Sequence, residues 1–184
     1  MKNNALKILF IYNGIFVFAS GLLGPLYAIF VGTIDKNIIS ISISWSVFLL
    51  STTLSMLFLR NYGDKVREKE YFLLAGFLIR ALVWFTFPFI STIFFLIILQ
   101  ALLGIGEALG SPTFDTIFAE HLDDGRHIRE YTDWKLISNI ASAFAIILGG
   151  IIIKRFGFSI LFYIMGVLSL ISFFGILFKP RKLL

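Results

Sequence analysis

Residues 81–106 read ALVWFTFPFISTIFFLIILQALLGIG, an almost wholly apolar run that Arg80 precedes and Glu107 follows. Pro88 and Ser91 interrupt the run, and a proline inside a helix removes a backbone hydrogen bond and crowds the preceding turn. A helix needs about 20 mainly apolar residues to cross roughly 30 Å of hydrocarbon. We therefore predict two membrane-spanning helices that meet near Pro88, each completed by residues outside the run.

Four further stretches of the chain carry no charged residue. They are residues 8–34, 37–59, 136–153 and 156–178. A transmembrane β-strand would instead alternate polar and apolar residues in segments of about ten. The fold class that we predict is an all-α integral membrane protein, a single bundle over residues 1–184. Its six transmembrane helices are expected at about 8–32, 38–59, 71–89, 93–119, 134–153 and 158–178. The first span is too long for the core of a signal peptide, so we expect it to be retained.

The composition supports the same fold class. Hydrophobic residues make up 58% of the 184 residues and charged residues 15%, against about 25% charged residues in a typical soluble domain. Such a chain lacks the polar surface of a soluble enzyme, a disordered segment or a nucleic-acid-binding module. The absence of cysteine excludes a disulfide framework, a thiol nucleophile and a cysteine-type zinc site.

The basic residues indicate an orientation. With the N-terminus in the cytoplasm, twelve of the 16 Lys and Arg residues flank the spans on the cytoplasmic side, three lie outside, and Arg80 lies within a span. This is a strong positive-inside bias. An even number of spans places both termini in the cytoplasm, and we expect the cell membrane as the location. The net charge of +5 then reflects topology and contact with anionic lipid headgroups, so no nucleic acid partner is expected.

The two halves of the predicted bundle, about 8–89 and 93–178, share weak features. Each begins with a helix that carries small residues followed by proline, and the second helix of each half ends in a basic–aromatic–glycine turn. The matching elements are Gly21, Gly24 and Pro25 with Gly106, Gly110 and Pro112, and residues 60–63 with 154–157. Three spans is an odd number, so the halves would be inverted repeats, which are typical of secondary transporters. The alternative is that glycine and proline are simply common in membrane helices.

Two motifs carry a resemblance to a known family. The first is the loop Gly63-Asp64-Lys65-Val66-Arg67-Glu68-Lys69 after the second span, and the second is Gly104-Ile105-Gly106-Glu107-Ala108, with Pro112 following in the fourth span. In these places the chain resembles one half of a major facilitator superfamily transporter. The resemblance implies secondary active transport of an unknown small solute by alternating access, with protons as a candidate coupling ion.

A complete member of that family has two six-helix bundles with the substrate between them. The resemblance therefore implies a second six-helix bundle as partner, either a second copy of this chain or a separate chain. The alternative is a truncated or partner membrane subunit without transport activity of its own.

Three of the polar residues within the predicted spans are candidates for the transport path: Arg80, Gln100 and Glu107. Ionisable groups inside a bilayer are costly and usually face the bundle interior or a wet cavity. Glu107 is either a protonation or cation-binding site, or the partner of Arg80 in a structural ion pair that holds two helices in register. Both interpretations remain open from the sequence.

The resemblance also implies a cytoplasmic gate. Its loop contains Gly63, Asp64, Lys65 and Arg67, with Asp115 of the fourth span as the acidic partner of Lys65 and Arg67. Asp64 would cap a helix end of the opposite bundle, because anions are attracted to helix N-termini; the alternative is a solvated turn. The fourth span also carries Gly104, Gly106, Gly110 and Pro112, and its glycines permit close helix packing.

An enzymatic function is not expected. Asp124-Gly125 and Arg129 are similar to the start of the CDP-alcohol phosphotransferase signature, but Ser142 and Ile146 stand where that signature has metal-binding aspartates. Hard divalent cations need those carboxylate oxygens. His121 and His127 lack recognised ligand spacing, so we expect no metal and no organic cofactor. Since no nucleotide site is present, an ion gradient would supply the energy.

Overall fold

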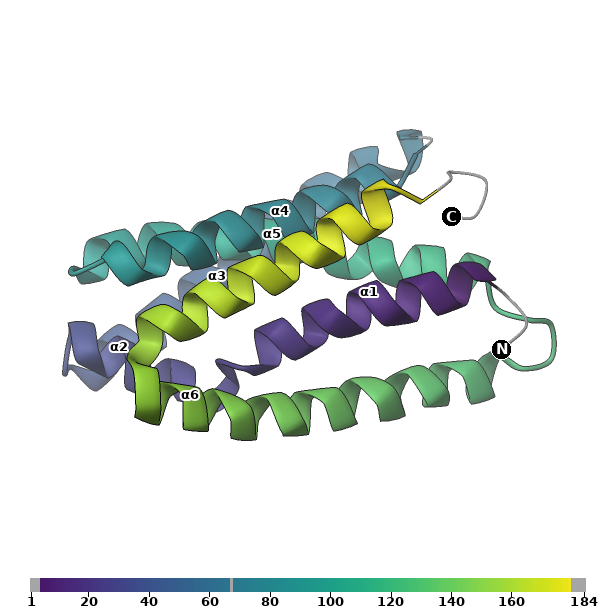
Figure 1. Ribbon diagram of the computed structural model, residues 1–184. Helices are drawn as coiled ribbons and strands as arrows, with labels where there is room; N and C mark the ends of the chain where they lie inside the picture. The colour runs from purple at the N-terminus through teal and green to yellow at the C-terminus, as the bar shows by residue number, and fades with distance from the viewer. Residues whose placement is uncertain (1–3, 67, 180–184) are drawn as a thin grey trace.

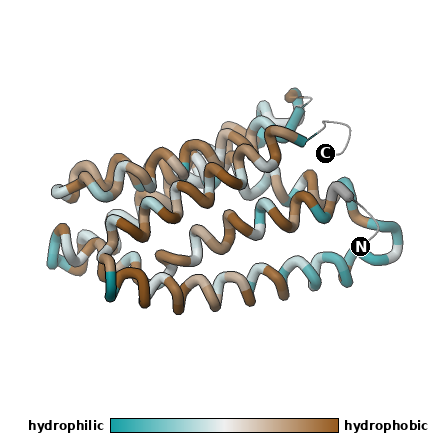
Figure 2. Tube along the Cα trace, viewed as in Figure 1, coloured by the Kyte–Doolittle hydropathy of each residue, from teal (hydrophilic) through white to brown (hydrophobic). Residues whose placement is uncertain are grey.

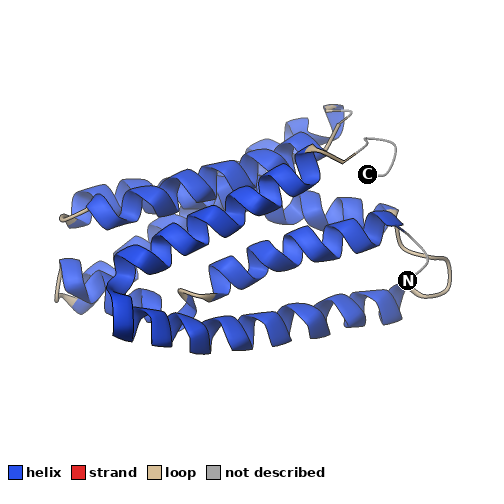
Figure 3. Cartoon of the chain, viewed as in Figure 1, coloured by secondary structure: helices blue, strands red, loops and turns tan. Residues whose placement is uncertain are grey.

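The computed structural model describes residues 4–66 and 68–179, and every regular element in that part of the chain is helical (Figure 3). In chain order the elements are α1 (Asn4–Gly21), η1 (Gly24–Leu26), α2 (Tyr27–Ile34), α3 (Ile38–Tyr62), η2 (Gly63–Lys65), α4 (Glu70–Thr86), η3 (Phe87–Phe89), α5 (Ile93–Glu120) and α6 (His127–Leu177). The predicted all-α class is therefore confirmed for the described residues.

Five helical segments are long and apolar enough to cross a membrane. They are Leu6–Ile34, Ile38–Tyr62, Glu70–Phe89, Ile93–Glu120 and His127–Leu177, with mean hydropathies between 1.6 and 2.4. The helices lie side by side in one bundle (Figure 1), with hydrophobic residues along their length and hydrophilic residues gathered near their ends (Figure 2). This distribution is that of an integral membrane protein.

The first span is not the continuous helix that the sequence predicts. α1 ends at Gly21, the short helix η1 begins at Gly24, and α2 continues to Ile34. Pro25 has no N–H to donate to the carbonyl of Gly21, four residues earlier, so the helix cannot continue through it. Gly24 has φ of +32°, a value that L side chains rarely adopt. The first span is therefore broken about two-thirds of the way along.

The last two predicted helices form one element, α6. The predicted link at residues 154–157 is helical except at Gly157, whose φ of 80° and ψ of 177° are not helical. Figure 1 shows that α6 turns sharply back on itself, so that its two arms run in opposite directions. α6 also begins at His127, seven residues before the predicted start, and Glu130 in its first turn accepts a hydrogen bond from the backbone N–H of Asp123.

Small residues set the helix crossings. α1 packs along α6, α3 packs along α5, and α4 packs against both α5 and α6. A Cβ added to Gly21 would lie 3.1 Å from the Cβ of Ala145, and one added to Gly149 would overlap the carbonyl of Leu22. Across the bundle, the hydroxyl of Ser169 donates a hydrogen bond of 2.8 Å to the carbonyl of Phe77. Such contacts take the place of the hydrophobic effect between helices in lipid.

The helix α3 is the least enclosed of the spans. Only 11% of its apolar window is buried inside the bundle, against 39–50% for the other four spans. It packs mainly on α5, where a Cβ added to Gly104 would lie 2.9 Å from the backbone nitrogen of Thr52 and where the hydroxyl of Ser51 donates to the carbonyl of Ala101 at 2.7 Å. The remainder of its surface is available to lipid or to a partner.

Candidate functional site

The centre of the bundle holds an ion pair between α4 and α5. Nη1 of Arg80 lies 2.6 Å from Oε2 of Glu107. The two residues are 27 positions apart and come from helices that run in opposite directions, so their meeting depends on the register of α4 against α5. The structure thus brings together the two ionisable groups that the sequence places deep in the membrane.

The side chain of Arg80 is enclosed, with only 6% of it exposed. Its Nε donates a hydrogen bond of 3.0 Å to the carbonyl of Gly76, and its guanidinium carbon lies 4.0 Å from the ring centroid of Phe16. A Cβ added to Gly106 would lie 2.9 Å from Cγ of Arg80, and one added to Gly110 would overlap Nη2. Glycines therefore form the slot that admits the arginine, and the Phe16 ring gives a cation–π contact.

Glu107 is held differently, because a third of its side chain remains exposed. Its Oε2 accepts from Arg80 and its Oε1 accepts from the hydroxyl of Ser111, one turn further along α5. A carboxylate offers about four acceptor positions, so these two bonds leave acceptor capacity unused. A solute that reached this place would meet the carboxylate, since the guanidinium is covered.

A polar cavity of about 330 Å³ lies on one side of the ion pair. Helices α1, α5 and α6 form its walls, and Asp115 and Lys135 lie toward the end with the α5–α6 turn. Its polar lining residues are Asn13, Ser20, Arg80, Glu107, Ser111, Asp115, Lys135, Ser138 and Ser142. Polar groups predominate over the apolar side chains that complete the lining, so water can occupy the cavity.

A second cavity, of about 180 Å³, lies on the other side of the pair and is mainly aromatic. Its aromatic lining residues are Phe16, Tyr27, Trp45, Phe48, Trp84 and Phe87. Gln100, which is 1% exposed, lines it beside Arg80 and Glu107. The hydroxyl of Tyr27 donates to Oγ of Ser44 at 2.8 Å and lies within hydrogen-bonding reach of Gln100. Arg80 and Glu107 thus separate a polar cavity from an aromatic one.

Comparison with known proteins identifies the family. The family model described as Major Facilitator Superfamily matches residues 9–183. The chain belongs to the major facilitator superfamily. It is also 28% identical, over 155 residues, to an "Uncharacterized MFS-type transporter YitZ" of Bacillus subtilis (strain 168), a match that covers 84% of this chain and 94% of the relative. No solved structure matches the chain.

Membership of the major facilitator superfamily confirms the resemblance that the motifs at 63–69 and 104–108 predict. It makes the chain a member of a transporter family and supports its place in a membrane. Since the 155 matched residues are 94% of the relative, that relative is likewise about as long as a single bundle.

The described residues predicted for the gate loop lie at the α3–α4 turn. Gly63, Asp64 and Lys65 form η2, and Nζ of Lys65 lies 4.9 Å from the ring centroid of Tyr62. Arg67 lies outside the described residues. The contact from this turn to α5 is an ion pair between Lys69 and Glu120.

None of the ion pairs among the described residues joins Asp115 to Lys65, and its other expected partner, Arg67, lies outside them, so the gate pairing stays a prediction. Asp115 lines the polar cavity, where Lys135 of α6 and Glu107 are the charges that act on it. Asp115 lies two helical turns beyond Glu107 and therefore on the side of α5 that faces the cavity. Glu120 lies at the end of α5, near the α3–α4 turn. The α3–α4 turn contacts Glu120 instead, through Lys69.

Two groups that contact the site, Phe16 and Lys135, were not identified from the sequence. Phe16 and Lys135 come from α1 and α6, and no local pattern connects them to Arg80 or Asp115. Among the described residues, no group of three or more His, Asp or Glu side chains is arranged to hold a metal.

Proposed function

We propose that the chain is one six-crossing bundle of a secondary transporter that works by alternating access with a second bundle. The turn at Gly157 divides α6 into arms at residues 127–156 and 158–177. At 1.5 Å per residue each arm is about 30 Å long or longer, enough to cross the hydrocarbon. The start of α1 and the end of α6 lie at the same end of the bundle (Figure 1), which supports an even number of crossings. The positive-inside bias of the basic residues supports cytoplasmic termini.

The packing supports two inverted repeats, at about 8–89 and 93–178. The first helix of each half packs against the second helix of the other half: α1 lies along the first arm of α6, and α5 lies along α3. A glycine of the first helix lies at each crossing, Gly21 against Ser142 and Gly104 against Thr52. This exchange is the arrangement expected when two copies of one motif face in opposite directions.

One observation carries the transport function: the partly exposed carboxylate of Glu107 stands between two cavities that lie on either side of it. Complete enclosure would add to the desolvation cost of the pair, and Glu107 remains partly exposed where Arg80 is enclosed. A carboxylate that borders both a polar and an aromatic cavity is placed to meet a solute or a proton from either side. Gln100 and Asp115 would be further polar contacts along this path.

The surface of α3 supports a partner bundle in the cell membrane. Its mean hydropathy of 1.6 is the lowest of the five spans, and it is also the least buried. A span that faced only lipid would be expected to be among the most apolar. We therefore place the second bundle, a second copy or a separate chain, against α3, with Asp64 and Lys65 closing the cytoplasmic side.

The site favours a small solute with a positive charge or with hydrogen-bond donors. Acceptor capacity remains on Glu107, the donors of Arg80 are enclosed, and aromatic rings line the neighbouring cavity. Aromatic faces attract cations. An anionic solute would have to displace Glu107 from Arg80 before it could bind.

Cysteine accessibility tests the path, because the natural chain has no cysteine. Ser138→Cys lines the polar cavity and Trp45→Cys lines the aromatic one. We expect a membrane-impermeant maleimide to label Ser138→Cys from the cytoplasmic side of oriented vesicles and Trp45→Cys from the opposite side. Thr132→Cys, at the exposed start of α6, is the control that reacts from the cytoplasm alone. Labelling of both cavity positions from one side would contradict a path through the bundle.

A further inference from the structure

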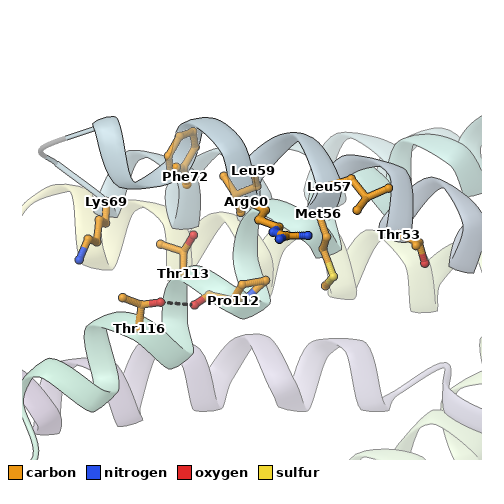
Figure 4. A pocket seen from close by; sticks show the side chains of 11 residues that line it. Thr53, Met56, Leu57, Leu59, Arg60, Lys69, Phe72, Pro112, Thr113 and Thr116 are labelled. Atoms are coloured by element: carbon orange, nitrogen blue, oxygen red, sulfur yellow. Dashed lines mark hydrogen bonds between the residues drawn. The ribbon is translucent and has the colours of Figure 1, made fainter.

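A separate apolar groove lies on the outside of the bundle between α3, α4 and α5. Its volume is about 540 Å³, and it does not include Arg80 or Glu107. Helices α3 and α4 both pack on α5 but share no extended contact with each other, so α5 forms the floor of the groove. Its lining residues are Thr53, Met56, Leu57, Leu59, Arg60, Gly63, Lys69, Phe72, Pro112, Thr113 and Thr116 (Figure 4).

The walls of this groove offer few free polar groups. Pro112 has no N–H, and its carbonyl accepts a hydrogen bond of 2.8 Å from the hydroxyl of Thr116. The hydroxyl of Thr53 donates to the carbonyl of Leu49 at 2.9 Å. These two hydroxyls are thus satisfied within their own helices, and the same groove is lined by the apolar side chains of Met56 and Phe72. Water finds few hydrogen-bonding partners in such a groove, whereas a hydrocarbon chain can bury apolar surface there.

A cation without a described acidic partner lies among the lining residues of the groove, between Leu59 and Met56 (Figure 4). Arg60 lies in the last turn of α3, its side chain is exposed, and none of the ion pairs among the described residues includes it. Lys69, which also lines the groove, is already paired with Glu120. Figure 4 shows Arg60 on the same helix as Met56 and Leu57, across from the threonines of α5. The groove therefore combines an apolar wall with one available positive charge.

We propose that this groove binds an anionic phospholipid, with an acyl chain between α3 and α4 and the phosphate against Arg60. A groove of this kind in a membrane-spanning bundle opens to the bilayer, where acyl chains are the abundant apolar partner. A basic residue beside the surface of the bilayer favours an anionic lipid over a zwitterionic one. The proposal does not depend on what solute the central cavities bind.

Native mass spectrometry of the delipidated chain in detergent tests the proposal. The probes are phosphatidylglycerol and phosphatidylcholine with identical palmitoyl and oleoyl chains. We expect the first bound phosphatidylglycerol to be retained about fivefold more strongly, as one basic residue near an anionic headgroup implies. Arg60→Gln should abolish this preference and Arg60→Lys should keep most of it. Arg155→Gln, which removes an exposed arginine from α6, should leave the preference unchanged.

A substitution that fills the groove tests its apolar part independently of the charge of Arg60. Thr116→Phe places a ring on the floor and should lower retention of both lipids several-fold, while inorganic phosphate should compete with neither. Equal retention of the two lipids by the natural chain would overturn the proposal, as would an unchanged preference in Arg60→Gln. If Arg60→Gln and Thr116→Phe instead convert a dimer to a monomer without altering lipid retention, a second copy occupies the groove and the proposal is wrong.

Discussion

Nη1 of Arg80 lies 2.6 Å from Oε2 of Glu107, and this contact joins α4 to α5 at the place where a polar and an aromatic cavity meet. The two partners are unequal, since Arg80 is enclosed and a third of Glu107 is exposed. Arg80 thus holds one side of the Glu107 carboxylate, while the other side of the carboxylate faces the cavities.

Removing the enclosed charge should destabilise the bundle. Arg80→Gln leaves Glu107 without its cation, and we expect a loss of about 1–3 kcal/mol, somewhat less than for a pair in which both partners are fully buried. The midpoint of thermal unfolding in detergent measures it. The double variant Arg80→Glu/Glu107→Arg should recover little, because the glycine slot fits an arginine on α4 alone. A neutral effect of Arg80→Gln would show that the pair does not stabilise the fold.

Filling the glycine slot around Arg80 should also lower the stability of the fold, with no change in charge. A Cβ at Gly110 would overlap Nη2 of Arg80, whereas a Cβ at Gly150 would meet nothing within 4 Å. We expect Gly110→Ala to lower stability by about 1–3 kcal/mol, as overpacking usually does. Gly150→Ala should be neutral or stabilise by up to about 1 kcal/mol, because alanine favours helix. Equal thermal shifts in the two variants would mean that the slot tolerates a methyl group.

The exposed carboxylate should select ligands by charge. Choline, 3,3-dimethylbutan-1-ol and 3,3-dimethylbutanoate share nearly one shape and carry positive, zero and negative charge. Each of the three tryptophans lines one of the two cavities, so intrinsic fluorescence reports binding. We expect choline to bind about tenfold more tightly than the alcohol, the carboxylate to bind least, and Glu107→Gln to remove the advantage of choline.

Glu120→Gln is the matched control for the charge series, because Glu120 pairs with Lys69 at the end of the bundle, outside both cavities. It should keep the order of the three affinities. Preference for the anion in the natural chain would refute a cation-selecting site, and preference for none would leave the aromatic cavity as the dominant contact.

A pH-dependent contribution is expected between α2 and α3, outside the spans. The hydroxyl of Ser40 and the N–H of Asn37 donate to Asp35, and these hydrogen bonds lower the pKa of its carboxyl. A lowered folded pKa stabilises the fold above the ordinary pKa of aspartate, and this contribution is lost as the pH falls through the folded value. Ser40→Ala should therefore unfold at a lower temperature than the natural chain at neutral pH.

The difference caused by Ser40→Ala should shrink as the pH falls through the pKa of Asp35. Thermal unfolding between about pH 3 and pH 7, the range that covers titration of an aspartate, measures this convergence. Ser42→Ala changes an exposed hydroxyl on the same helix and should show no such trend. A difference that stays constant over this range would assign the effect of Ser40 to packing and not to Asp35.

The spans were predictable because a bilayer imposes a length and a lack of charge. The first and last residues of the helices were harder to predict. Lys154 and Arg155 suggested a link, yet both are helical, since basic side chains near a helix end can extend to the interface. His127 to Asp133 carries charges that suggested a loop, yet nothing in it breaks a helix outside the membrane. Hydropathy thus locates the hydrocarbon part of a helix and not its full length.

The central site was predictable in part. Counting residues from the helix ends placed Arg80 and Glu107 at similar depth, and the structure pairs them. The pairing of Lys69 with Glu120 was not predictable, because it depends on how the α3–α4 turn lies against α5. Contacts such as that of Phe16 with Arg80 come from the packing of distant segments, and no local pattern encodes them.

Gly157 has a further consequence for motion. With one residue as the only non-helical connection between its arms, α6 has no slack that would let one arm slide along the other. Any change in the angle between the arms must therefore come from the backbone angles of Gly157, which glycine can vary more freely than other residues. The hydrogen bond from Ser169 to Phe77 ties the second arm to α4, so such a change would move the first arm relative to the pair formed by the second arm and α4.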